Sequence, residues 1–282
     1  MSISDHRVAN CKLKEYIAPN LKIEKGLVMA LITANFYSNA LGTGTSATVI
    51  LPDNKAAAPP YQVLYLMGGG FTDHTYMMRE IPVERYVWDY NLAVVMPYMA
   101  GRYLYKNMPY GEQWWDYYSQ ELPEICEKMF NISKERKDTF VAGNSGGALC
   151  ALKLGLQKPE KFSAVGAVFP PLLSQPFVNE LRGNAPWRYE QIAHFYGDPM
   201  DPEYDIFNIL KNASTKEQKA DLYLCCGTED ALFEINTKFR DRATELGFNP
   251  NWYQGPGTHS ADFFAEGFLK ILDWLPLNRI QK

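Results

Sequence analysis

The sequence has few cysteines and little excess charge, and each shortage argues against a class of function. Its five cysteines are an odd number at irregular spacing, without a C-x-x-C pair or paired Cys/His spacing. Neither a disulfide framework nor a metal site is therefore predicted. The net charge is only −4, which argues against a surface that binds nucleic acid or an anionic membrane.

Long apolar runs are also missing. Residues 1–20 carry scattered charges in place of the apolar core of a signal peptide, and no later stretch is long enough to span a bilayer. These absences favour a cytoplasmic protein. What the chain does have is 46% hydrophobic and 21% charged residues, a balance typical of a globular protein with a buried core.

Short apolar stretches alternate with stretches of helical spacing over most of the chain. This alternation is typical of a mostly parallel sheet with helices on both faces, an α/β fold. Strands are predicted at 27–37, 46–51, 61–67, 92–96, 139–142, 164–169, 221–226 and 250–254, and helices at 82–90, 114–130, 145–157, 232–246 and 261–275.

Residues 172–220 interrupt this alternation, because they contain four prolines and no strong strand. We expect a helical insertion over the C-terminal edge of the sheet. It would either close over a pocket as a small cap or serve as a dimer surface, so a homo-oligomer stays open. Without internal repeats or low-complexity segments, the simplest organisation is one domain, 1–282, with this cap-like insertion.

A G-x-S-x-G motif, Gly143 to Gly147, joins the strand at 139–142 to the helix that follows. A serine at such a turn has a strained backbone, and small neighbours let the turn close. The amide of Gly146 would then point to the same position as the hydroxyl of Ser145. The alternative is a glycine-rich turn with an incidental serine, because short motifs often match by chance.

A nucleophilic serine needs a base, and the base needs an acid to orient it. Of only four histidines, His259 alone lies between the last strand and the last helix, at the edge where such a sheet delivers reactive side chains. Asp230 follows the strand at 221–226, with Glu229 as its competitor and helix capping as its alternative role. The order Ser145, Asp230, His259 is that of α/β-hydrolases.

Three consecutive glycines follow the strand at 61–67. Backbone amides stabilise an oxyanion well because they need no reorganisation. We expect one donor from Gly146 and the second from Gly70, with Gly69 as the alternative donor and as a substrate-binding position.

An aromatic segment, residues 98–115, starts where the strand at 92–96 reaches the same edge. Such a segment can bind an acyl chain, a phenolic ring or a sugar. Tyr105 and Trp114 are the residues we expect to contact substrate. The alternative is that several of these aromatics only pack against the following helix.

Six runs of the sequence resemble the tributyrin esterase family. This family is part of the esterase D group, which includes S-formylglutathione hydrolases and some feruloyl esterases. The resemblance implies an α/β-hydrolase fold that acts on short acyl esters without a metal or organic cofactor. It implies Ser145, Asp230 and His259 as a catalytic triad and Gly70 and Gly146 as oxyanion donors. The runs are 63–70, 92–97, 119–123, 143–147, 226–230 and 255–259, within a match from 27 to 275.

Two positions depart from the family's usual pattern. Gly68 replaces a histidine of the loop, and Gly146 replaces the methionine that often follows the nucleophile. Both changes remove side-chain volume near the expected reacting centre. The substrate preference therefore need not follow that of the family.

The sequence as a whole predicts a serine carboxylesterase that hydrolyses a small ester through an acyl-enzyme. Alternatives within enzymes are an S-formylglutathione hydrolase and a feruloyl or acetyl-sugar esterase; a different class is a hydrolase-fold protein that binds without turnover. A glutathione tail would require basic residues near the pocket, for which Arg79, Arg85, Arg102 and Lys106 are candidates.

Overall fold

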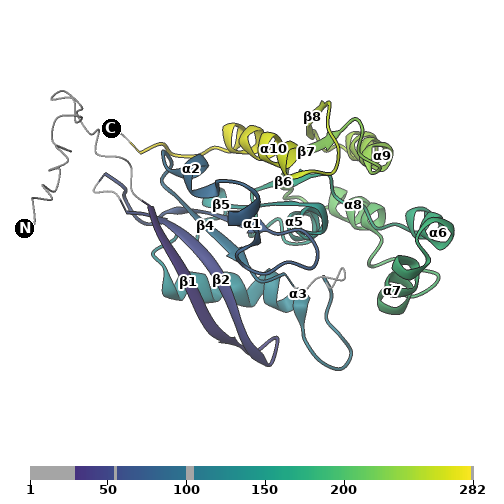
Figure 1. Ribbon diagram of the computed structural model, residues 1–282, viewed down its shortest axis with the longest axis horizontal. Coiled ribbons are helices and arrows are strands. Elements are labelled where there is room, and N and C mark those ends of the chain that lie inside the picture. Colours follow the sequence, from purple (N-terminus) through teal and green to yellow (C-terminus); the bar gives the residue numbers. More distant parts are fainter. Residues whose placement is uncertain (1–28, 54–55, 100–104, 281–282) are drawn as a thin grey trace, which may run out of the picture.

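A single eight-stranded sheet forms the centre of the computed structural model, which describes residues 29–53, 56–99 and 105–280 (Figure 1). The spatial order of the strands is β1-β2-β4-β3-β5-β6-β7-β8. Their bounds are β1 (Met29–Ser38), β2 (Thr43–Pro52), β3 (Gln62–Met67), β4 (Leu92–Pro97), β5 (Thr139–Asn144), β6 (Ala164–Val168), β7 (Asp221–Gly227) and β8 (Asn251–Gly255).

Strand direction explains why some strands are apolar along their whole length whereas others alternate between buried and exposed residues. β1 and β2 pair antiparallel, as do β2 and β4, whereas every pairing from β4 to β8 is parallel. β3, β4, β5 and β6 are buried along their whole length, because helices cover both faces of a parallel sheet. β1 alternates between buried and more exposed residues. The predicted α/β architecture is confirmed.

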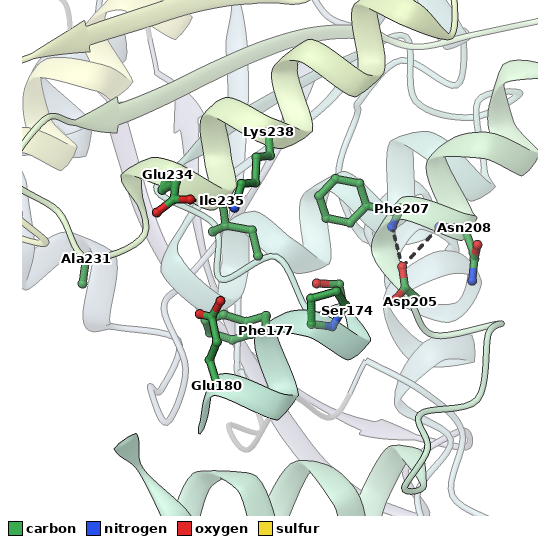
Figure 2. A pocket seen from close by; sticks show the side chains of 11 residues that line it. Ser174, Phe177, Glu180, Asp205, Phe207, Asn208, Ala231, Glu234, Ile235 and Lys238 are labelled. Atoms are coloured by element: carbon green, nitrogen blue, oxygen red, sulfur yellow. Dashed lines mark hydrogen bonds and ion pairs between the residues drawn. The ribbon is translucent and has the colours of Figure 1, made fainter. Parts of the chain in front are cut away.

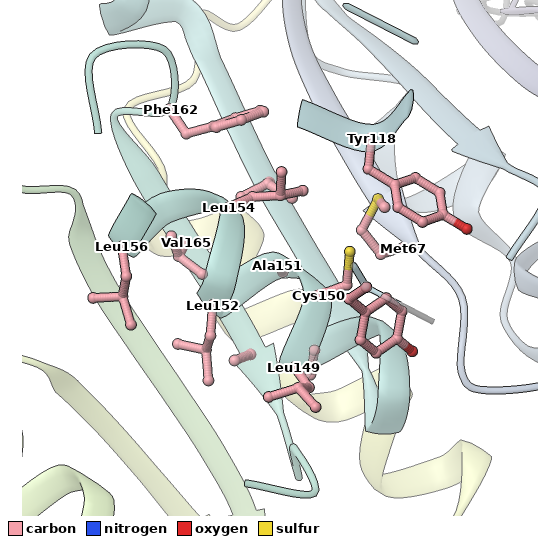
Figure 3. Packing of buried hydrophobic residues seen from close by; sticks show 14 of the residues in the cluster. Met67, Tyr118, Leu149, Cys150, Ala151, Leu152, Leu154, Leu156, Phe162 and Val165 are labelled. Atoms are coloured by element: carbon pink, nitrogen blue, oxygen red, sulfur yellow. The ribbon is translucent and has the colours of Figure 1, made fainter. Parts of the chain in front are cut away.

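Alternate residues of the strands enter two separate cores, as the period of two requires. In β3, Val63, Tyr65 and Met67 face one core, while Leu64 and Leu66 face the other. Figure 3 shows side chains of α5 (Ser145–Gln157) in the first core with Met67 and Tyr118. That core includes residues of α3 (Trp114–Asp116), the π-helical η2 (Tyr117–Glu121), α4 (Leu122–Met129), α5 (Ser145–Gln157) and α9 (Phe233–Glu245).

The second core is formed by three helices on the opposite face of the sheet. These are α1 (Tyr76–Glu80), α2 (Val83–Val87) and α10 (Ala261–Trp274). A short 3-10 helix, η3 (Arg136–Asp138), leads into β5. No helix within the described ranges is both long and apolar enough to span a membrane.

The segment 172–220 contains three helices, as the proline-rich pattern predicts. They are α6 (Gln175–Asn184), α7 (Pro186–Tyr196) and α8 (Ile206–Ser214). α8 packs against α5 and α9, whereas α6 and α7 pair with each other and extend away from the sheet in Figure 1. The role of this insertion as a cap stays a prediction.

Adjacent residues of α10 allow a direct test of the second core. Phe268 is fully buried and lies beside Tyr86 and Phe264, whereas Leu269 is 40% exposed. Phe268→Ala should lower the free energy of unfolding in urea by about 3–5 kcal/mol, because it removes buried area and leaves a cavity. Leu269→Ala is the matched control, with an expected loss below about 1 kcal/mol. Equal losses would contradict this assignment of the core.

Candidate active site

The turn between β5 and α5 places Ser145 in a left-handed backbone conformation, with φ of +50°. This conformation is strained for a residue other than glycine. A β-carbon added at Gly147 would lie 2.1 Å from the carbonyl oxygen of Met67 and 2.2 Å from that of Gly68, and one at Gly143 would lie 2.6 Å from the Met67 oxygen. Glycine is therefore required at both positions, since the turn packs directly on the end of β3.

Ser145, His259 and Asp230 form a continuous chain of hydrogen bonds. Nε2 of His259 lies 2.9 Å from Oγ of Ser145, and its Nδ1 lies 2.8 Å from Oδ2 of Asp230. Because a carboxylate only accepts, Nδ1 carries the proton and Nε2 is free to accept from the serine hydroxyl. The structure thus brings together the three residues expected from the sequence. Glu229, the competing acid, is exposed.

Burial differs sharply along this chain. The side chain of Asp230 is 1% exposed and that of His259 is 41% exposed. The other oxygen of the buried carboxylate, Oδ1, accepts a hydrogen bond of 2.8 Å from the backbone amide of Leu232. The carboxylate is therefore held in one orientation, while the imidazole is partly exposed to solvent.

The loops that carry Asp230 and His259 are joined by their backbones. The amide of Thr228 donates to the carbonyl of Gly255 at 2.9 Å, and the amide of Glu229 donates to that of Gly257 at 3.0 Å. A β-carbon at Gly227 would lie only 2.2 Å from the Gly257 oxygen. The parallel pairing of β7 and β8 thus continues past the strand ends and sets the spacing of acid and base.

Phe169 is a residue of this site that the sequence analysis missed. It follows β6 with φ of +40°, is 1% exposed, and its ring centroid lies 4.1 Å from that of His259. The buried ring limits how far the imidazole can rotate. The sequence feature that could have identified Phe169 was its position at the end of a predicted strand, directly before Pro170.

The expected oxyanion residues face each other beside Ser145. A β-carbon at Gly146 would lie 3.1 Å from the backbone nitrogen of Gly70. A β-carbon at Gly70 itself would meet nothing within 4 Å, so the space above this residue is open. Gly69 lies against the side chain of Asn144, which is 3.6 Å from its added β-carbon.

Neighbouring side chains occupy the space at both glycine departures. The hydroxyl of Tyr105 lies 2.6 Å from a β-carbon added at Gly146, and Oγ1 of Thr72 lies 2.7 Å from one added at Gly68. Tyr105 therefore reaches Gly146, and its contact with substrate stays a prediction. Both glycines thus lack a side chain, as the sequence shows, and atoms of Tyr105 and Thr72 lie where a β-carbon would begin.

Tyr105 is tied to α5 by a buried lysine. Its backbone carbonyl accepts a hydrogen bond of 2.6 Å from Nζ of Lys153, on α5. The same ammonium lies 5.2 Å from the centre of the Trp115 ring. Desolvation lowers the pKa of Lys153 to about 8.

The structure places Trp114 one ring further away. It is 7% exposed and stacks on Tyr118 at 5.7 Å, and Tyr118 in turn lies 6.5 Å from Tyr105. A direct contact of Trp114 with substrate stays a prediction.

Arg102, considered for a glutathione tail, lies outside the described residues. Across the described part of the chain, no three His, Cys, Asp or Glu side chains form a group that could hold a metal ion.

Comparison with known proteins matches most of this chain to the model of one family. Residues 38–267 fit the model of a family described as putative esterase. An acetyl esterase from Caldicellulosiruptor saccharolyticus is 23% identical over 88% of this chain and 98% of its own length.

Two solved structures from Staphylococcus aureus are also similar. An S-formylglutathione hydrolase is 28% identical over 88% of this chain and 99% of that chain, with a TM-score of 0.78. A fluorophosphonate-binding serine hydrolase with bound substrate is 27% identical over 88% and 98%, with the same TM-score of 0.78. The expected α/β-hydrolase fold is confirmed.

The lowered pKa of Lys153 gives a stability prediction. The folded chain releases this proton near pH 8, whereas the unfolded chain keeps it to near the ordinary value of 10.5. Between these values the unfolded state binds more protons, so stability rises with pH. Relative to Lys153→Met, the wild type should gain about 2 kcal/mol in the free energy of unfolding from pH 7.5 to 9.5. A pH-independent difference between the two urea curves would contradict the burial of a titrating lysine.

Proposed function

Because the chain belongs to the putative esterase family, it is a serine carboxylic ester hydrolase, and we propose that Ser145, His259 and Asp230 are its catalytic triad. Its relatives are those of the esterase D group, as the sequence resemblance implies. The observation that carries the proposal is the unbroken chain of hydrogen bonds, 2.9 Å and 2.8 Å long, from the serine through the histidine to the buried acid.

The geometry supports a two-step acyl transfer. Nε2 of His259 removes the hydroxyl proton as Oγ of Ser145 attacks the ester carbonyl, and Asp230 stabilises the imidazolium that forms. The amides of Gly70 and Gly146 hold the oxyanion. The imidazolium then protonates the leaving alcohol. Water, activated by the same nitrogen, attacks the acyl-enzyme and releases the acid.

We propose short acyl groups as the preferred substrates. The Tyr105 hydroxyl narrows the space beside Gly146, and Tyr105 is itself fixed by Lys153. Nζ of Lys106 donates to the carbonyl of Phe195, which ties this segment to α7 of the insertion. The similarity to an acetyl esterase points the same way.

An S-formylglutathione hydrolase is the second candidate, favoured by the 28% identity to such an enzyme. Its formyl thioester would suit the same small acyl site. Two of the four basic residues considered for the glutathione tail are already engaged, since Arg79 pairs with Asp73 at 3.2 Å and Lys106 with the Phe195 carbonyl. Comparison of kcat/KM for S-formylglutathione and p-nitrophenyl acetate distinguishes the candidates.

A fluorophosphonate probe tests the triad and the non-catalytic alternative together. The probe should label the wild type at Ser145 and fail to label Ser145→Ala, while Ser214→Ala, which removes a hydroxyl on α8, should label normally. His259→Ala should lower kcat for p-nitrophenyl acetate by about 10⁴-fold or more, because the serine loses its base. Absence of labelling, or labelling that is unaffected by His259→Ala, would contradict the mechanism.

Acyl length tests the substrate class. Initial rates on p-nitrophenyl esters should be highest for acetate and butyrate and should fall on longer chains, since the Tyr105 hydroxyl narrows the space beside Gly146. Faster hydrolysis of a decanoate ester than of the butyrate would overturn the short-acyl proposal.

The contact between positions 105 and 146 has a testable consequence. Gly146→Ala should lower kcat/KM by about 10-fold or more, because the added methyl group meets the Tyr105 hydroxyl and displaces the adjacent amide. Tyr105→Phe removes that hydroxyl. The double variant should therefore be about 5-fold or more faster than Gly146→Ala alone, a coupling typical of residues in contact. Independent, multiplicative effects would show that the clash is not the cause.

A further inference from the structure

A cavity of about 500 Å³ lies between the insertion and α9 (Figure 2). Residues of α6, α8 and α9 line it, and at one end so does Ala231, the residue after Asp230. Ser145 and His259 do not line it. Its volume is within the range of sites that bind small organic molecules, roughly 300–1,000 Å³.

The walls of this cavity are apolar on three sides. Phe177 comes from α6, Phe207 from α8 and Ile235 from α9, and Figure 2 shows these side chains grouped around one space. Each is only partly buried, so apolar surface from three separate helices remains in contact with solvent. A ring or short aliphatic chain would cover this surface favourably.

The charges at the cavity are not balanced. Nζ of Lys238 pairs with Glu234 at 2.7 Å. The carboxylate of Asp205 is satisfied by backbone amides of Phe207 at 2.9 Å and Gln175 at 3.0 Å. Glu180 is exposed and makes no hydrogen bond or ion pair with any described residue. The cavity thus carries three carboxylates and one ammonium, and Glu180 has no partner at hydrogen-bond distance in the described part of the chain.

The field of that carboxylate reaches across the opening. The pKa of Lys238 is raised by its hydrogen bond with Glu234 and by the charge of Glu234, and Glu180 adds a smaller contribution of the same sign. Two acids therefore act on one lysine. A second cation at this position would meet a negative potential, whereas an anion would be repelled.

We propose that this cavity is a second ligand site, which binds an organic cation with an aromatic or short aliphatic body. The apolar body packs on Phe177, Phe207 and Ile235, and the ammonium group pairs with Glu180. The site is separate from the ester-binding site and does not depend on its chemistry.

Three probes of one shape test the charge preference. Calorimetric titration of the full chain at pH 7 compares 3-phenylpropylamine, 3-phenylpropanol and 3-phenylpropionate. The amine should bind with a dissociation constant on the order of 1 mM or tighter, as expected for a ligand of this size. It should bind about 10-fold or more tighter than the carboxylate, with the alcohol between them. Equal or tighter binding of the carboxylate would overturn the proposal.

Variants establish where the amine binds. Glu180→Gln should weaken the amine about 10-fold and leave the alcohol unchanged, while Glu190→Gln, an exposed acid on α7 outside the cavity, should change neither. Ile235→Trp should fill the cavity and abolish binding of both. Phe177→Ala, which removes one wall, is the alternative if the tryptophan variant does not fold by circular dichroism. Unchanged affinity in Glu180→Gln, or in the folded cavity variant, would place the amine elsewhere and overturn the proposal.

Discussion

Direct backbone contact between the end of β3 and the start of α5 is the constraint on which the rest of this site depends. The turn at Ser145 packs so closely on the carbonyls of Met67 and Gly68 that no side chain fits at Gly147. The serine at this turn has a strained backbone conformation, with φ of +50°. The same contact brings the loop after β3 beside Gly146, so one packing requirement positions both the hydroxyl and the proposed oxyanion donors.

The remaining parts of the site come from strands on one side of that turn. β6 supplies Phe169, β7 leads to Asp230 and β8 leads to His259, in the order in which these strands follow β5 across the sheet. The imidazole is restrained by a buried ring, a buried carboxylate and a loop hydrogen-bonded to its neighbour. Such restraint lets a histidine transfer protons without an entropic cost of orienting its ring at each turnover.

At the two glycines that depart from the family pattern, side chains from other parts of the chain occupy the space beside the serine. The Tyr105 hydroxyl and Thr72 lie where side chains at 146 and 68 would begin. Lys153 then fixes Tyr105 from within α5. The space beside Gly146 is thus bounded by a residue far from Ser145 in sequence, and the insertion adds a separate cavity beside α9.

The strands, most of the helices, the G-x-S-x-G turn and the order Ser145, Asp230, His259 could be predicted from the sequence, whereas α1 was missed. These features are local, since strand periodicity, turn glycines and the position of a residue after a strand depend on neighbours along the chain. The burial of Asp230 against His259, the contact of Phe169 with His259 and the filling of the space at Gly146 came only from the tertiary structure. Each depends on the order and register of strands distant in sequence, which determine the side chains that meet at the sheet edge.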